Sequence, residues 1–341
     1  MSTSTKRGAL GLAVPFKAGL WPWPELLFWS CAIAAYFLFQ ERLPLITEIF
    51  VLGLFALSLD LILGYAGIVS LGHAAFFGVG AYTAGILAQS GWGEPVSGLL
   101  IAAVTAMAVG FASSFLVLRG RDLTRLMVTL GVAMLIYEAA NQAAWLTGGA
   151  DGLVGMTVWP VLGVFEFDLY GHTAYWYSFA VLFLLFCLAR RLVNSPFGLS
   201  LRGIKENRLR MAAIGTPVNR RLVLIYTVAA GYAGAAGALL AQTTQFVSLD
   251  VLAFHRSAEA LLMLVIGGSG MLYGALVGAL SFKVLQDLFS NWTAQYWQFW
   301  LGLLLVLLVL FARGGIMGAA QALRRRHARG RRASAPQERR S

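Results

Sequence analysis

Long apolar stretches recur along the chain and are separated by short polar or basic segments. A helix that crosses a bilayer needs about 20 mostly apolar residues. The pattern therefore predicts membrane-spanning helices at residues 26–40, 45–64, 70–89, 96–118, 126–146, 175–192, 222–243, 257–289 and 296–312. The first stretch follows a basic arm, as in a signal peptide, but Gln40-Glu41-Arg42 offers no small-residue cleavage site. We therefore interpret it as a retained helix.

The distribution of Lys and Arg predicts how these spans are oriented. All but three of the 26 Lys and Arg residues lie in four stretches that alternate with apolar spans. The exceptions are Arg42, Arg256 and Lys283. Because an excess of Lys and Arg marks cytoplasmic loops, we expect all four stretches in the cytoplasm. They are the N-terminal arm, the linker 119–125, the loop 190–221 and the C-terminal tail.

The apolar stretch 257–289 decides the number of spans. If it crossed the membrane once, the chain would have nine spans, and its two basic termini would lie on opposite sides. Splitting it at Gly267-Gly268-Ser269-Gly270 gives ten spans and places both termini in the cytoplasm. Such a break is typical of broken or re-entrant helices in transport proteins, although a tight hairpin fits the pattern equally well. Gly270, Gly274 and Gly278, spaced by four, would let another backbone approach closely.

The sequence thus predicts an all-α, polytopic inner-membrane bundle of about ten membrane segments, some broken or re-entrant, with both termini cytoplasmic. Five spans on each side of the loop 147–174 would run in opposite orientations, which suggests an inverted repeat. Residues 78–82 weakly resemble residues 274–278. The expected organisation is a basic cytoplasmic arm (1–25), a transmembrane domain (26–318) with the cytoplasmic loop 190–221, and a basic disordered tail (319–341).

Composition excludes several other classes of protein. The chain is 59% hydrophobic and 12% charged, whereas soluble domains are about 25% charged. A net charge of +11 would otherwise suggest nucleic acid, but the cations bracket apolar spans and do not line a soluble face. Cys31 and Cys187 lie within apolar spans and offer no disulfide or metal framework. P-loop, hydrolase-triad and HExxH motifs are absent, so we expect neither enzyme activity nor a cofactor in this chain.

Residues 60–82 are unusually rich in glycine and small polar residues for a segment at membrane depth. Polar side chains in a bilayer tend to face the interior of a bundle or a cavity, so we predict that this segment borders a translocation path together with the glycine-rich break. For Asp60 and His73, a hydrogen bond between helices without solute contact is equally compatible. The path residues predicted here are Asp60, Gly64, Tyr65, Gly67, Ser70, Gly72, His73, Tyr82, Gly267 and Gly268.

The loop 190–221 contains a predicted short amphipathic helix at residues 201–214. Apolar residues such as Ile204 and Leu209 stand among its cations, and Gly215-Thr216-Pro217 ends it. A helix of this kind either docks in a groove of a partner protein or lies on anionic lipid.

Several motifs together closely resemble those of branched-chain amino-acid ABC permeases. Residues 57–67, 70–76 and 78–83 are similar to the signature of that family, and residues 146–153 are similar to an external loop of its LivM-type subunits. Further matches in family order are 195–198, 212–215, 257–259 and 267–270 followed by Gly274. The sequence departs from the family at several positions. Asp60 stands where Asn is common, and His255 and Arg256 interrupt a usually apolar stretch.

The resemblance implies a heterodimer with a LivH-type permease subunit, two ATP-binding cassette subunits that carry ATP and Mg, and an extracytoplasmic solute-binding protein, in a bacterial inner membrane. The implied solutes are Leu, Ile and Val. Related permeases carry urea, short amides or organic acids, and a stand-alone secondary transporter or channel is the alternative of another class. The resemblance adds Glu259 to the path residues. It assigns ATPase coupling to Arg202, Lys205, Arg208, Arg210, Ala212, Ala213 and Gly215.

Overall fold

The computed structural model describes residues 23–120, 122–168 and 170–292, and towards the C-terminus residues 295–296, 299–300, 302–303, 306 and 315–318. The regular structure of these residues is helical and is accompanied by two isolated β-bridges, Leu153–Val247 and Val161–Phe165. The predicted all-α class is therefore confirmed.

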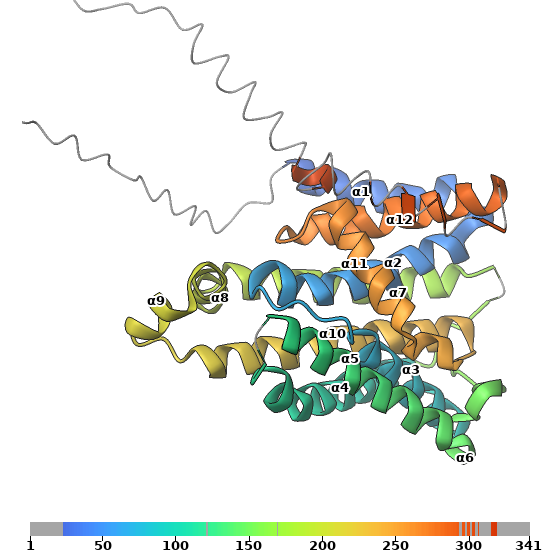
Figure 1. The fold of residues 1–341 in the computed structure, drawn as a ribbon. Coiled ribbons are helices and arrows are strands. Elements are labelled where there is room, and N and C mark those ends of the chain that lie inside the picture. Colours follow the sequence, from blue (N-terminus) through green and yellow to red (C-terminus); the bar gives the residue numbers. More distant parts are fainter. Residues whose placement is uncertain are drawn as a thin grey trace, which may run out of the picture. The chain divides into compact units, whose positions relative to one another are not determined.

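The helices follow one another along the chain as Figure 1 shows. The chain divides into two compact units at the Arg42–Leu43 junction, and the description below concerns the second unit. In chain order the elements are α1 (Trp23–Leu38), η1 (Gln40–Arg42), α2 (Leu43–Asp60), the π-helical turn η2 (Leu61–Tyr65), α3 (Ala74–Gln89), α4 (Pro95–Val117), α5 (Asp122–Gln142), α6 (Ala144–Thr147), η3 (Gly149–Asp151), α7 (His172–Asn194), α8 (Pro196–Glu206), α9 (Arg208–Ala213), α10 (Val218–Thr244), η4 (Leu249–Leu252), α11 (Phe254–Gly267) and α12 (Leu272–Trp292).

Six helices of the described part are long and apolar enough to cross a membrane: Gln40–Tyr65, Pro95–Val117, Leu123–Gln142, His172–Asn194, Val218–Thr244 and Leu272–Trp292. Two further apolar helices, Glu25–Leu38 and Ala74–Gln89, are shorter, and α11 has 14 residues. The predicted span 296–312 lies largely outside the described residues, as do residues 1–22 of the arm and the tail 319–341. The chain is a polytopic membrane protein, while the count of about ten spans stays a prediction.

Two sets of helix ends define the two ends of the second unit. One end of the unit carries Arg119, Arg125 and the loop 190–221. It is formed by the last residues of α4, the first residues of α5 and the segment that runs from the last turn of α7 to the first turn of α10. We call it the basic end; Figure 1 shows α8 and α9 together there, with α6 at the opposite end. The linker and the basic loop thus lie at the same end, as the charge pattern predicts.

The predicted split of the stretch 257–289 is present. α11 ends at Gly267 and α12 begins at Leu272. A Cβ atom added to Gly267 or Gly278 would collide with backbone atoms of the other helix, at Gly274 and Met263 respectively. The two helices therefore touch backbone to backbone, as glycines at a spacing of four predict. They form a close hairpin whose first helix is shorter than a full span.

Two predicted helices differ from those observed. The helix predicted at 70–89 begins only at Ala74, because residues 66–73 are not helical and Gly67 has a φ of +69°. The single helix predicted at 201–214 is wrong, since α8 ends at Glu206 and α9 begins at Arg208. Asn207 separates them in an extended conformation, and its side chain accepts a 2.9 Å hydrogen bond from the Arg210 N–H. Asparagine caps helix starts in this way, which the apolar spacing did not reveal.

The second unit contains two helical triplets with matching contacts. The triplets are α2-α3-α4 and α10-α11-α12. Within them, α3 packs on α4 just as α11 packs on α12. Between them, α4 packs on α10 just as α12 packs on α2, and α2 packs on α10. The first turns of α2 and the last turns of α10 line the same cavity, so the triplets α2-α3-α4 and α10-α11-α12 run in opposite directions. This is the arrangement that an inverted repeat produces. It makes α3 equivalent to α11, whereas the weak motif similarity would pair α3 with α12.

Small residues let α10 lie very close to α3 and α4. A Cβ atom added to Gly234 would lie 2.9 Å from the Ala102 carbonyl oxygen of α4, and one added to Gly237 would collide with the Phe77 carbonyl of α3. From Ala229 to Leu239 every residue of α10 is buried. Contacts of this kind drive helix association where lipid removes the hydrophobic driving force.

Candidate functional site

The end of α2 departs from regular helix. The π-helical turn Leu61–Tyr65 is followed by residues 66–73, which are not helical and lead into α3. π-helical turns are rare and occur frequently at functional sites. This irregular stretch contains six of the predicted path residues: Gly64, Tyr65, Gly67, Ser70, Gly72 and His73.

The basic loop holds this end of α2. Lys205 of α8 donates a 2.7 Å hydrogen bond from Nζ to the Gly64 carbonyl oxygen, one of the groups that a helix end leaves without an intrahelical partner. The Arg202 guanidinium lies over the Tyr65 ring, 5.2 Å from the ring centre, a cation–π contact. A Cβ atom added to Gly67 would lie 3.0 Å from the Lys205 side chain. Two predicted coupling residues therefore contact three predicted path residues.

Asp60 ties the same end of α2 to the turn between α11 and α12. Its side chain is fully buried, and Oδ1 accepts a 2.7 Å hydrogen bond from the Gly270 N–H. The other carboxylate oxygen is buried without a hydrogen-bond partner. The end of α2, the turn 268–271 and α8 thus meet at the basic end. We call this place the junction, made of Asp60, Gly64, Tyr65, Arg202, Lys205 and Gly270.

His73 lies inside the protein, where it contacts other helices. It is fully buried, and its Nε2 lies 2.8 Å from the Ser58 hydroxyl of α2. Its ring stacks on Phe55 and meets the edge of Phe76. The contact with Ser58 is a hydrogen bond between helices, while the place of His73 beside a path stays a prediction. Ser70 is also fully buried, and Tyr82 of α3 is buried.

The two short helices α3 and α11 meet at their N-termini. The Ala74 N–H donates a 2.8 Å hydrogen bond to the Ser257 hydroxyl oxygen. A Cβ atom added to Gly72 would collide with the Thr129 carbonyl of α5, so α5 packs directly against the segment that leads into α3. Short helices at equivalent positions of two inverted halves are a pointer to a transport path. Gly267 and Gly268 lie at the other end of α11, near the junction.

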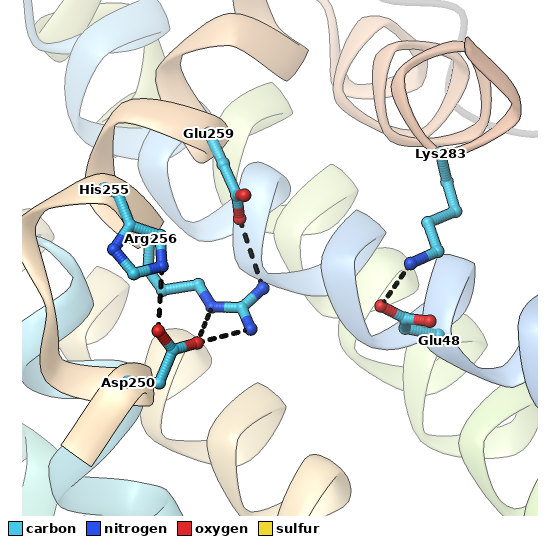
Figure 2. Close-up of polar contacts among 6 residues, drawn as sticks. All are labelled: Glu48, Asp250, His255, Arg256, Glu259 and Lys283. Carbon is cyan, nitrogen blue, oxygen red and sulfur yellow. Dashed lines mark hydrogen bonds and ion pairs between the residues drawn. The ribbon is translucent and has the colours of Figure 1, made fainter. Parts of the chain in front are cut away.

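Glu259, predicted as a path residue, belongs to a charged cluster away from the junction (Figure 2). Arg256 donates from Nε and Nη2 to Asp250 Oδ2, at 3.1 and 2.7 Å, and from Nη1 to Glu259 Oε2 at 3.2 Å. His255 Nε2 lies 3.0 Å from the other Asp250 oxygen. Figure 2 also shows a separate ion pair between two spans, in which Lys283 Nζ lies 2.6 Å from Glu48 Oε1.

Sequence reasoning missed Glu48 and Asp250. It noted Lys283 as a cation outside the basic stretches, and Arg256 both as such a cation and as a departure from the family. Because a charge at membrane depth needs a counter-ion, these two cations were the signal that acidic partners should be sought in neighbouring spans.

The remaining predicted coupling residues lie on α9 and just after it. Arg210, Ala212, Ala213 and Gly215 are exposed, and Arg208 is partly exposed. Their apolar neighbours Leu209 and Ile214 are also exposed, at 82% and 69%. Exposed large apolar residues rimmed by cations are typical of a surface that binds a protein or a membrane.

Taken together, a bundle of apolar helices, the irregular end of α2 and an exposed basic element at one end are the features of a membrane transport subunit. The family described as "Branched-chain amino acid transport system / permease component" matches residues 42–312. The chain belongs to this family of permeases.

Three relatives show the range of proteins that the chain resembles. It is 28% identical to the high-affinity branched-chain amino acid transport system permease protein LivM of Escherichia coli, over 76% of this chain and 66% of LivM. It is 28% identical to the autoinducer 2 import system permease protein LsrC of an Enterobacter species, over 72% of this chain and 70% of LsrC. It is 23% identical to the permease protein LivH of E. coli, over 78% of this chain and 90% of LivH. No solved structure matches the chain significantly.

Proposed function

We propose that this chain is the LivM-type permease subunit of an ABC importer that carries branched-chain amino acids across a bacterial inner membrane. Its family and its likeness to LivM support this function. It would pair with a LivH-type subunit, take its solute from an extracytoplasmic binding protein and draw energy from two ATP-binding cassette subunits. The single observation that carries the proposal is the junction, where an exposed basic element is bonded directly to the irregular end of α2.

In this proposal the basic end faces the cytoplasm, because it holds the Lys and Arg residues that resist translocation. The exposed surface of α9, with Leu209 and Ile214 among its arginines, docks on an ATPase subunit. Movement of that subunit reaches α2 through Lys205 and Arg202, and reaches the turn 268–271 through Asp60. The segment 60–73 and Gly267 and Gly268 border the path on its cytoplasmic side, while Tyr82 and Glu259 belong to its outer part.

Uptake by the whole importer tests the function. Cells that make this chain with its partner permease, ATPases and binding protein should take up labelled leucine saturably, and unlabelled isoleucine and valine should compete. Uptake should disappear when the ATPase subunits are inactivated by mutation. Competition by urea or acetamide but not by valine would change the solute class. Undiminished uptake with inactive ATPases would instead mean a secondary transporter or channel.

A single cysteine tests both the orientation and the docking surface. In a chain whose Cys31 and Cys187 are replaced by serine, Arg210→Cys should react with an impermeant maleimide in inside-out vesicles but not in intact cells. Adding the ATPase subunits should protect it, because α9 is then covered. Trp159→Cys, in an exposed segment at the opposite end, is the matched control. It should react in intact cells with or without the ATPases. Equal reaction of position 210 with and without ATPases would rule out docking on α9.

A further inference from the structure

A cavity of about 820 Å³ opens at the end of the second unit opposite the junction. Its walls come from the first turns of α2, the start of α7 and the segment before it, the end of α10 and the segment that follows, and Arg256 of α11. The volume lies within the range of about 300 to 1,000 Å³ that small-molecule sites occupy. Nothing in the junction uses this cavity.

Charges of both signs face the cavity from different elements. Glu48 of α2, Asp168 before α7 and Asp250 of η4 contribute carboxylates, and Arg256 contributes a guanidinium. Lys283 binds Oε1 of Glu48, and His255 gives Asp250 a second partner besides Arg256. Asp250 can therefore keep one partner when Arg256 turns to a ligand.

Stability alone is a poor explanation for these charges. Arg256 and Asp250 are 29% and 45% exposed, and ion pairs between exposed side chains contribute only about 0 to 1 kcal/mol to stability. Ionisable side chains within a membrane protein are costly and tend to mark ion or substrate pathways. The side chain of Glu259, which Arg256 also binds, is only 15% exposed. A charged cluster held in this way beside a cavity points to a ligand with charges of its own.

A buried hydroxyl gives a second, independent indication of a ligand. Thr47 lines the cavity on α2, one residue before Glu48, and is 4% exposed. Its hydroxyl oxygen is buried without a hydrogen-bond partner. Because a buried polar group without a partner is costly, a ligand group that binds Thr47 would remove that cost.

The rest of the lining is apolar. Leu45 and Val51 of α2, Leu240 of α10 and Val251 of η4 line the same cavity. An aliphatic side chain would bury its surface against them, which is favourable by about 25 cal/mol per Å². The cavity thus combines an acidic side, a basic side and an apolar wall.

We propose that this cavity is a binding site for a zwitterionic α-amino acid with an aliphatic side chain, whose carboxylate binds Arg256 and whose ammonium binds Glu48, with Thr47 as an additional hydrogen-bonding group. The inference rests on the proposed function, because it identifies a site at the outer end of the path where this chain would hold the importer's solute. It also gives a role to Arg256, which the family resemblance left as an unexplained departure.

Ligands that lack one charge test the site on the unaltered chain. The full-length chain is assembled with its partner permease in lipid nanodiscs, and binding of tritiated leucine is measured without the binding protein. Unlabelled leucine should compete, whereas 4-methylpentanoate, which lacks the ammonium, and isopentylamine, which lacks the carboxylate, should each compete at least tenfold more weakly. If either half-ligand competes as well as leucine, or if leucine does not bind, the inference is overturned.

Variants then assign the charges to residues. The double variant Arg256→Gln/Glu259→Gln removes one charge of each sign. Asp250 loses Arg256 but keeps His255 as a partner, so the variant should assemble. It should bind leucine at least tenfold more weakly and bind isopentylamine as before. Thr47→Val, which keeps the side-chain shape, should weaken leucine binding several-fold. Glu138→Gln, an exposed charge change on α5, is the control and should bind leucine normally. Normal leucine binding by the double variant would contradict the role of Arg256.

These results remain separate from the proposed function. If the whole importer takes up leucine but the nanodisc complex shows no zwitterion preference, only the cavity assignment fails. If the whole importer takes up no branched-chain amino acid, the proposed solute class fails whatever the cavity binds.

Discussion

Asp60→Ala should lower leucine uptake by the assembled importer at least tenfold. The change removes the acceptor of the Gly270 N–H, so the end of α2 is no longer bonded to the turn between α11 and α12. A hydrogen bond to a charged group contributes about 1.5 to 3 kcal/mol, so we expect the free energy of unfolding to fall by about 2 kcal/mol. Uptake at matched expression and thermal unfolding of the solubilised complex are the two measurements.

Asp60→Asn is the matched control for this change. Its amide oxygen still accepts a hydrogen bond from Gly270, so uptake should stay within about threefold of the original chain. Lys205→Met, which keeps the length of the side chain but loses the bond to the Gly64 carbonyl, should reduce uptake with little effect on unfolding. If alanine and asparagine at position 60 behave alike, the bond to Gly270 has no part in transport.

Gly278→Ala should prevent stable folding of the second unit. Its new Cβ would collide with the Met263 carbonyl and lie 3.1 Å from the Gly267 nitrogen, and both neighbours are backbone atoms that cannot rotate away. Separating the α11–α12 hairpin to relieve the collision should cost about 3 kcal/mol. We expect little monodisperse protein after extraction, measured by size-exclusion chromatography.

Gly131→Ala on α5 is the corresponding control. A Cβ atom added there meets nothing within 4 Å. Because alanine is a better helix former than glycine by about 1 kcal/mol, this variant should be at least as stable as the original chain. Similar yields and unfolding temperatures for the two alanine variants would show that the hairpin is not packed as closely as described.

Periodicity and composition predicted the helices well because a spanning helix is specified locally, by a run of apolar residues. The glycine-rich break at 267–270 was predictable for the same reason. One error arose where a single polar residue decides the outcome: Asn207 divides the predicted helix 201–214 because its side chain caps a new helix. The other arose at residues 66–73, where the predicted helix was begun at residue 70 although the segment that follows the positive-φ residue Gly67 is not helical before Ala74.

The candidate site was only partly predictable. Gly64, Tyr65 and Lys205 were each chosen from local features, but nothing in the sequence indicated that α8 would bond to the end of α2. The same is true of the pairing of Glu48 with Lys283, residues from opposite ends of the membrane domain's sequence. Such contacts depend on how distant helices pack, which the local apolar pattern does not specify.

The small residues of α10 determine where this protein can change shape. Where backbones of α3, α4 and α10 touch through glycines, there are no side-chain rotamers to absorb a displacement, so these three helices form a rigid body. The irregular segment 66–73 connects α2 to that body, and the turn 268–271 connects α11 to α12. We therefore expect alternating access in this chain to be a hinge motion about these two connections, with α8 bonded to the end of α2 beside the first of them.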